Sequence, residues 1–157
     1  MGVDIRRAGP DDAEAVAAIL LAAFEPLRAQ YTPAAFAATT PPAAVLRARL
    51  SEGPTWLALL DGKPVGTVSA VARGTDLYVR SMAVLPEARG LGIGARLLDE
   101  TEAFARANGL GRLTLSTTPF LDAAIALYEA AGFTRSAEGP ADLHGTPLAG
   151  MAKPLRD

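Results

Sequence analysis

The stretch Arg89-Gly90-Leu91-Gly92-Ile93-Gly94-Ala95 decides the fold of this chain. It lies between an apolar, strand-like segment at residues 76–85 and the most strongly patterned helical segment, at about residues 95–107. Alternate glycines let the backbone curl, so that several N–H groups converge at a helix N-terminus, where the helix dipole favours an anion. The stretch therefore predicts a turn that can hold a pyrophosphate.

Three interpretations of this turn compete. Gly90, Gly92 and Ala95 satisfy a G-x-G-x-x-G/A dinucleotide fingerprint, but that motif wants an acidic residue at the end of the next strand, where this chain has Ser116-Thr117-Thr118. A Walker-type loop needs a lysine, and none lies nearby. The third interpretation is a tight strand-to-helix turn that binds no ligand.

Outward from the turn, the hydrophobic periodicity alternates between that of strands and that of helices. Asp61-Gly62 between two apolar runs predicts a hairpin. The strand, helix and strand at 76–117 form a parallel, right-handed unit, with a cleft at the C-terminal ends of its strands. The fold is thus predicted to be mixed α/β (α+β). Its strands are expected at 3–8, 55–60, 64–72, 76–85, 112–117, 133–137 and 148–154, and its helices at 10–29, 31–38, 43–50, 95–107 and 120–131.

Composition bounds the function. The 157 residues, half of them apolar, predict a single domain over 1–157, and a net charge of −2 argues against nucleic acid as a partner. Cysteine is absent and His144 is the only histidine, so no thiolate relay and no clustered-histidine metal site is expected. The longest apolar run, 15–24, is too short to span a membrane, and no secretory signal is evident. A cytoplasmic protein without a membrane partner or a metal is predicted.

Two motifs resemble one known family. Residues 89–94 match the R/Q-x-x-G-x-G/A signature of the Gcn5-related N-acetyltransferases (GNAT), and residues 124–133 resemble their second signature, A-x-x-L-Y-x-x-x-G-F. Ile5-Arg6, Pro10, Asp12 and Val65-Gly66 extend the resemblance over nearly the whole chain. It implies a mostly antiparallel mixed sheet with a central parallel strand-helix-strand unit, flanked by helices.

The resemblance also implies an activity. GNAT proteins transfer an acyl group, usually acetyl, from acetyl-CoA to a primary amine, and no covalent enzyme intermediate forms. The acceptor would be a small molecule or a peptide, and acetyl-CoA would be the co-substrate, with no metal. A homodimer is among the expectations because dimers are common in the family. The rival interpretations are a non-catalytic acyl-CoA-binding module and a nucleotide-binding interaction domain of another lineage.

Site residues follow from the resemblance by position. Arg89, Gly90, Leu91, Gly92, Ile93, Gly94 and Ala95 would hold the pyrophosphate through main-chain N–H groups. The backbone of Met82, Ala83 and Val84 would pair with the pantetheine arm, and an N–H near Met82 or Ala83 would stabilise the oxyanion. Tyr128 falls on the tyrosine that commonly protonates the departing thiolate; its alternative is a packing role.

The chain departs from the family pattern at two places. Leu121 stands where many members have asparagine, so Thr117 or Thr118 is the candidate to replace that coenzyme contact. Some members of the family carry a carboxylate near position 78 as general base, but this chain reads Tyr78-Val79-Arg80 there. Asp76, the nearest carboxylate of that strand, Glu25 and His144 are therefore the candidates for the general base. For each of these three, an ordinary exposed side chain is the alternative.

Three further side chains bear on the acceptor. Tyr31 and Phe36 would line its pocket or else pack in the core. Arg80 would suit an acceptor that carries a carboxylate if it points into the cleft, with an exposed sheet position as the default.

Overall fold

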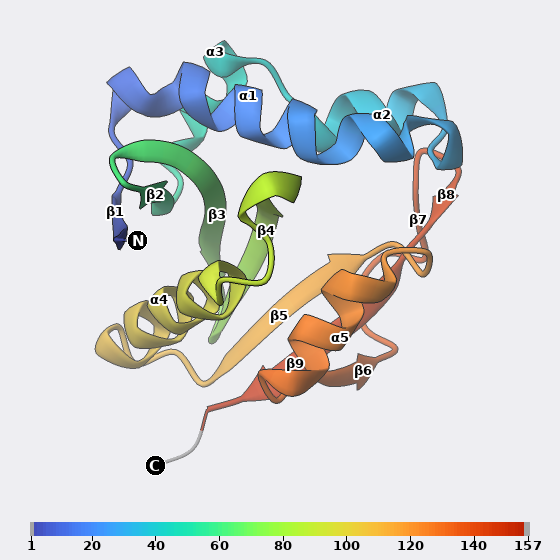
Figure 1. Cartoon of the computed structure of the whole chain (residues 1–157). Coiled ribbons are helices and arrows are strands. Elements are labelled where there is room, and N and C mark those ends of the chain that lie inside the picture. The colour runs from blue at the N-terminus through green and yellow to red at the C-terminus, as the bar shows by residue number, and fades with distance from the viewer. Residues whose placement is uncertain (1, 156–157) are drawn as a thin grey trace.

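The structure is a computed structural model and describes residues 2–155. A seven-stranded sheet in the order β1-β2-β3-β4-β5-β9-β6 forms its centre, and a separate hairpin pairs β7 with β8 (Figure 1). The predicted mixed α/β fold is confirmed. The strands are β1 (Val3–Arg7), β2 (Thr55–Leu60), β3 (Lys63–Arg73), β4 (Asp76–Val84), β5 (Arg112–Thr117), β6 (Thr134–Ser136), β7 (Asp142–Leu143), β8 (Thr146–Pro147) and β9 (Ala149–Pro154).

The helices cover both faces of the sheet (Figure 1). The α-helices are α1 (Ala13–Phe24), α2 (Pro33–Thr39), α3 (Ala43–Arg49), α4 (Ile93–Ala107) and α5 (Asp122–Ala130), and the 3-10 helices are η1 (Pro10–Asp12), η2 (Glu25–Gln30) and η3 (Pro86–Ala88). Buried side chains of α1 and α3 form one core with Leu57 and Ala83. The larger core lies on the other face, beneath α4 and α5.

Two helix boundaries differ from the prediction for identifiable reasons. The helix predicted over 10–29 is divided into η1, α1 and η2, with Pro26 in the first turn of η2, because proline cannot donate the backbone hydrogen bond that would continue the helix. Helix α4 begins at Ile93, two residues before the predicted start, because the left-handed Gly92 is its N-cap. Its predicted end at Asn108-Gly109 is confirmed.

Strands β4 and β5 run side by side for only part of their length. Their parallel pairing joins Asp76 to Arg112, Leu77 to Leu113 and Tyr78 to Thr114, and ends there. Strand β4 then continues to Val84 along β3 while β5 diverges from it (Figure 1). The residues of β4 beyond Tyr78 therefore lose their partner strand on one side, next to the glycine-rich turn.

A bulge lies in this unpaired part of β4. The register between β3 and β4 shifts between Thr67 and Ser69, and Ser81 has a left-handed φ of 54°. Before the bulge Leu77 and Val79 face the core beneath α4, and after it Met82 and Val84 do. The extra residue thus reverses which side chains of β4 face each layer.

The hairpin β7–β8 is absent from the predicted elements. It has a two-residue loop, His144 and Gly145, and both residues have positive φ, which is the geometry of a type I′ turn. The predicted turn at Asp61-Gly62 has the same geometry. Across residues 2–155, no helix combines the length and the apolar character that crossing a membrane requires.

Candidate functional site

The glycine-rich turn presents backbone donors without acceptors. Among residues 2–155, the N–H groups of residues 90–95 have no hydrogen-bond partner, while the Arg89 N–H donates to the Pro86 carbonyl over 3.3 Å. These six free donors precede and open a helix of 15 residues. Unpaired N–H groups and the positive end of the helix dipole together favour an anion at this point.

The glycines of the turn serve different purposes. Gly90 and Gly92 have φ values of 82° and 76° and open space around them, so they permit the left-handed backbone. Gly94 is right-handed, but a Cβ there would lie 2.7 Å from Leu127 Cδ2 and 3.2 Å from Met82 Cε. Gly94 therefore allows α4 to approach α5, and a groove lined by Ala95, Leu98 and Leu127 runs between these two helices.

The unpaired edge of β4 offers further donors. The Leu85 N–H donates to the Val65 carbonyl over 2.8 Å, which fixes the side of the strand that pairs with β3. In an antiparallel pair successive residues alternate in direction, so Ala83 also faces β3, opposite Thr67. The N–H groups of Met82 and Val84 point the other way, toward the space where β5 has separated.

Tyr128 lies on α5 in the core beneath the parted strands. Its side chain is 8% exposed and its ring centroid is 5.9 Å from that of Phe133. Burial and, to a smaller extent, the nearby Tyr31 raise the pKa of Tyr128 to about 12. Tyr128 therefore keeps its proton throughout the neutral range.

Tyr31 and Thr118 bring two more hydroxyl groups to this region. Burial raises the pKa of Tyr31, and the neighbouring Thr118 hydroxyl partly opposes that effect. Thr118 Oγ1 is itself buried and makes no hydrogen bond of ordinary geometry within residues 2–155. The ring of Tyr31 packs edge-on against Phe120, with centroids 5.0 Å apart. Three hydroxyls, from the residue after η2, the residue after β5 and helix α5, thus lie near one another. The separate sequence motifs did not indicate this arrangement.

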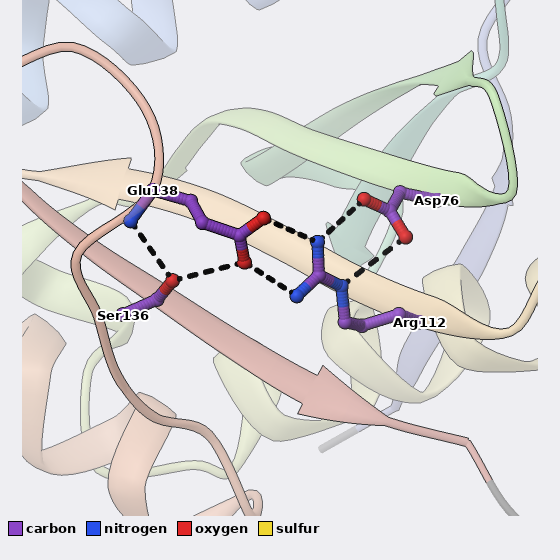
Figure 2. Close-up of polar contacts among 4 residues, drawn as sticks. All are labelled: Asp76, Arg112, Ser136 and Glu138. Carbon is purple, nitrogen blue, oxygen red and sulfur yellow. Dashed lines mark hydrogen bonds and ion pairs between the residues drawn. The ribbon is translucent and has the colours of Figure 1, made fainter.

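The candidate base Asp76 is the first residue of β4, in the part of the strand that pairs with β5. Arg112 binds both of its oxygens, over 3.2 and 2.8 Å. Arg112 also binds Glu138 over 2.6 Å, and Ser136 lies beside Glu138 (Figure 2). Asp76 is thus part of an ion-pair network that joins the starts of β4 and β5 to the loop after β6.

The other two base candidates are exposed. Glu25 pairs with Arg28 over 2.7 Å, and this hydrogen bond lowers the pKa of Glu25. His144 occupies the left-handed turn of the β7–β8 hairpin, and its carbonyl accepts a hydrogen bond from Thr32 Oγ1 over 2.7 Å. Within residues 2–155 no group of three or more metal-ligating side chains comes together.

Comparisons with known proteins agree with this geometry. A family model described as the acetyltransferase (GNAT) family matches residues 14–133. Over 84 residues the chain is 37% identical to a probable N-acetyltransferase camello of Xenopus tropicalis, covering 52% of this chain and 38% of that protein. Over 92 residues it is 41% identical to an IAA acetyltransferase of Azospirillum brasilense, covering 57% of this chain and 59% of that one. The match thus spans less than two thirds of the length of either relative.

A solved structure shares the fold over nearly the whole chain. The PaiA N-acetyltransferase of Thermoplasma acidophilum, crystallised in complex with coenzyme A, superposes with a TM-score of 0.83. The match covers 99% of this chain and 100% of that one at 17% sequence identity. At this identity the likeness concerns the fold alone.

Proposed function

The chain belongs to the acetyltransferase (GNAT) family, and from this premise we propose that it is an N-acetyltransferase that moves an acetyl group from acetyl-CoA to a primary amine. The observation that carries the proposal is the set of six N–H groups at residues 90–95 that find no hydrogen-bond partner in the described part of the chain, 2–155. A helix N-terminus with free donors suits a diphosphate, and these donors follow, along the chain, the part of β4 that β5 no longer accompanies.

Acetyl-CoA would supply the acetyl group as a thioester, and the residues of this chain would position it. The N–H groups of 90–95 would hold the diphosphate, while those of Met82 and Val84 would bind the pantetheine arm along β4. The Met82 N–H is also the donor available to the carbonyl oxygen of the acetyl group, where negative charge develops during attack by an amine.

Tyr128 is the proposed donor of a proton to the departing thiolate, since it is protonated at neutral pH. Thr118 is the proposed replacement for the coenzyme contact missing at Leu121, because its buried hydroxyl makes no hydrogen bond of ordinary geometry within residues 2–155. Of the base candidates we retain His144, because its hairpin packs through Leu143 against the cluster of Tyr31 and Phe36.

A substitution in the turn tests the proposal. In Gly92→Glu, a carboxylate and a side chain would occupy the position where backbone must meet phosphate, so acetyl-CoA affinity should fall on the order of 100-fold. Gly74→Glu is the matched control, because Gly74 also has a positive φ and open surroundings but lies in the turn between β3 and β4. Calorimetry measures binding and a free-thiol assay measures turnover.

The outcomes separate the alternatives. Equal acetyl-CoA affinity in Gly92→Glu and Gly74→Glu would exclude the glycine-rich turn as the coenzyme site. Binding by the wild type without thiol release in the presence of any amine would favour the rival function, a non-catalytic acyl-CoA-binding module. That rival is kept because position 121 is a leucine and no carboxylate stands at 78.

A further inference from the structure

A cluster of positive charge lies on the face of β4 that is turned toward α3. Arg80 of β4 donates to Glu52 over 2.7 Å. Arg49, the last residue of α3, donates to the hydroxyl of Ser81 over 3.3 Å. Arg73 stacks on the ring of Tyr78 at 4.1 Å. Three guanidinium groups thus share one carboxylate, and the Glu52 side chain is 52% exposed.

Glu52 alone does not balance the positive charge of Arg49 and Arg80. The Arg80 side chain is only 19% exposed, and its Nε is buried without a hydrogen-bond partner in the described residues. Burial and then the like charge of Arg80 lower the pKa of Arg49, and Glu52 offsets this only in part. Holding two guanidinium groups together out of water is unfavourable unless anions pair with them.

The cluster lies beside the place of the proposed transfer. Tyr78 is the last residue of β4 that pairs with β5, and Arg80 lies two positions after it and two positions before Met82. The glycine-rich turn and α4 lie on the opposite face of the sheet. A thioester held by that turn would enter between the strands from the α4 side, which leaves the α3 side open to the acceptor.

We propose that Arg49 and Arg80 form a subsite for a carboxylate carried by the acceptor, so that the substrate is an amine with an acidic group. This inference rests on the proposed function and names its substrate class. A guanidinium binds a planar carboxylate through two parallel hydrogen bonds. In Arg80 the two donors are the Nη2 that Glu52 now occupies and the Nε that has no hydrogen-bond partner within residues 2–155. Glu52, on an exposed turn after α3, occupies part of the subsite and can swing away.

A panel of matched acceptors tests this. The panel consists of amino acids with one to five carbons between amine and carboxylate, each paired with its carboxamide. Each acid and its amide are compared as substrates in the acetylation assay. Calorimetry then compares them as ligands of the protein bound to coenzyme A. For at least one spacing the acid should exceed its amide by about tenfold or more in kcat/KM and affinity, as expected for a hydrogen bond to a charged group.

Arg80→Gln and Arg49→Gln should each remove this preference and leave acetyl-CoA affinity unchanged. Arg47→Gln is the control, because Arg47 lies on the same helix but contacts the Pro10 carbonyl, and it should keep the preference. A wild type that binds and acetylates acids and amides equally overturns the inference while the proposed function stands. Acid-selective binding that needs Arg49 and Arg80, without acetylation, supports the subsite and contradicts the proposed function.

Discussion

Tyr128 occupies surroundings that make its hydroxyl a weak acid. Burial raises its pKa to about 12, whereas a thiol has an ordinary pKa of about 8.5. Transfer of the Tyr128 proton to a well-solvated thiolate would therefore cost about 5 kcal/mol, at 1.36 kcal/mol per pKa unit. The same burial that weakens the acid also raises the pKa of a thiol held beside it. The proposed role of Tyr128 thus depends on a thiolate that water does not reach.

Replacing Tyr128 by phenylalanine tests this role. Tyr128→Phe keeps the ring in its place against Phe133 but removes the proton, so kcat should fall on the order of 100-fold while acetyl-CoA affinity changes little. Steady-state kinetics and calorimetry measure the two quantities. Unchanged kcat would leave Tyr128 with a packing role only.

The pH dependence supplies the control for Tyr128. Because the pKa of Tyr128 is raised, its protonated form persists above about pH 10, the ordinary pKa of a tyrosine, and is lost only as the pH approaches 12. Wild-type kcat should therefore show no decline from this group between about pH 8 and 10. A decline in that range that disappears in Tyr128→Phe would contradict the assigned environment.

At the scale of elements, the β7–β8 hairpin fixes the start of α2. Thr32 caps α2 by accepting from the Ala35 N–H over 3.2 Å. The Thr32 N–H donates to Thr146 Oγ1 over 3.0 Å, and its hydroxyl donates to the His144 carbonyl. A hairpin near the C-terminus thus holds the segment that carries Tyr31 and Phe36, the aromatic side of the proposed acceptor region.

Thr146→Val tests this connection. Thr146 is 1% exposed, and valine keeps its shape while leaving the Thr32 N–H without an acceptor, which should lower the free energy of unfolding by about 1–3 kcal/mol. Thr39→Val is the matched control, because the Thr39 hydroxyl only donates to the Ala35 carbonyl within α2; it should change stability by less than about 0.5 kcal/mol. Denaturant titration measures both, and equal losses would contradict the coupling.

The sequence predicts those elements whose causes are local. Asp61-Gly62 gives its hairpin, and the pattern before Asn108-Gly109 gives α4, because turn conformation and helical periodicity are properties of short segments. The β7–β8 hairpin was missed although His144-Gly145 forms the same kind of turn, because its strands have only two residues each. The bulge at Ser81 has no local signal, since the serine is held in a left-handed conformation by the pairing around it.

Contacts between distant segments could not be predicted from the chain. Strand β9 inserts between β5 and β6, a choice of neighbours that hydrophobic pattern leaves open. The glycine-rich turn was found because one segment forms it. The closeness of Tyr31 to Tyr128 and the positions of Arg49 and Glu52 around Arg80 depend on how α3 and η2 pack across the sheet, so these parts of the candidate site appear only in the structure.

At the scale of the whole molecule, the sheet consists of two parts that touch at the paired ends of β4 and β5. Only three residue pairs join these strands, and Arg112 reinforces the junction by binding Asp76 and Glu138 (Figure 2). Its hydrogen bond lowers the pKa of Glu138. The network sets the point from which the strands diverge, and therefore the width of the space proposed for the pantetheine arm.

Arg112→Met should loosen this junction while it preserves most of the side-chain volume. We expect faster hydrogen exchange at the amides of residues 76–78 and 112–114, because opening of the junction no longer breaks an ion-pair network. Arg6→Met is the control, because Arg6 lies on the edge strand β1 and pairs with Asp12, away from the junction, and exchange at the junction should stay as in the wild type. Equal protection in both variants would show that Arg112 does not hold the two parts together.

Acidification should reproduce the effect in the wild type. A carboxylate whose folded pKa is lowered stabilises the protein above its ordinary pKa, about 4.3 for glutamate, and this contribution is lost as the pH falls through the lowered value. Exchange at the junction, corrected for the intrinsic effect of pH, should therefore quicken below about pH 4 in the wild type. In Arg112→Met the Glu138 pKa returns toward its ordinary value, so exchange at the junction should change little over the same pH range. An equal acid response in both proteins would show that the acid sensitivity of the junction arises outside the Arg112 network.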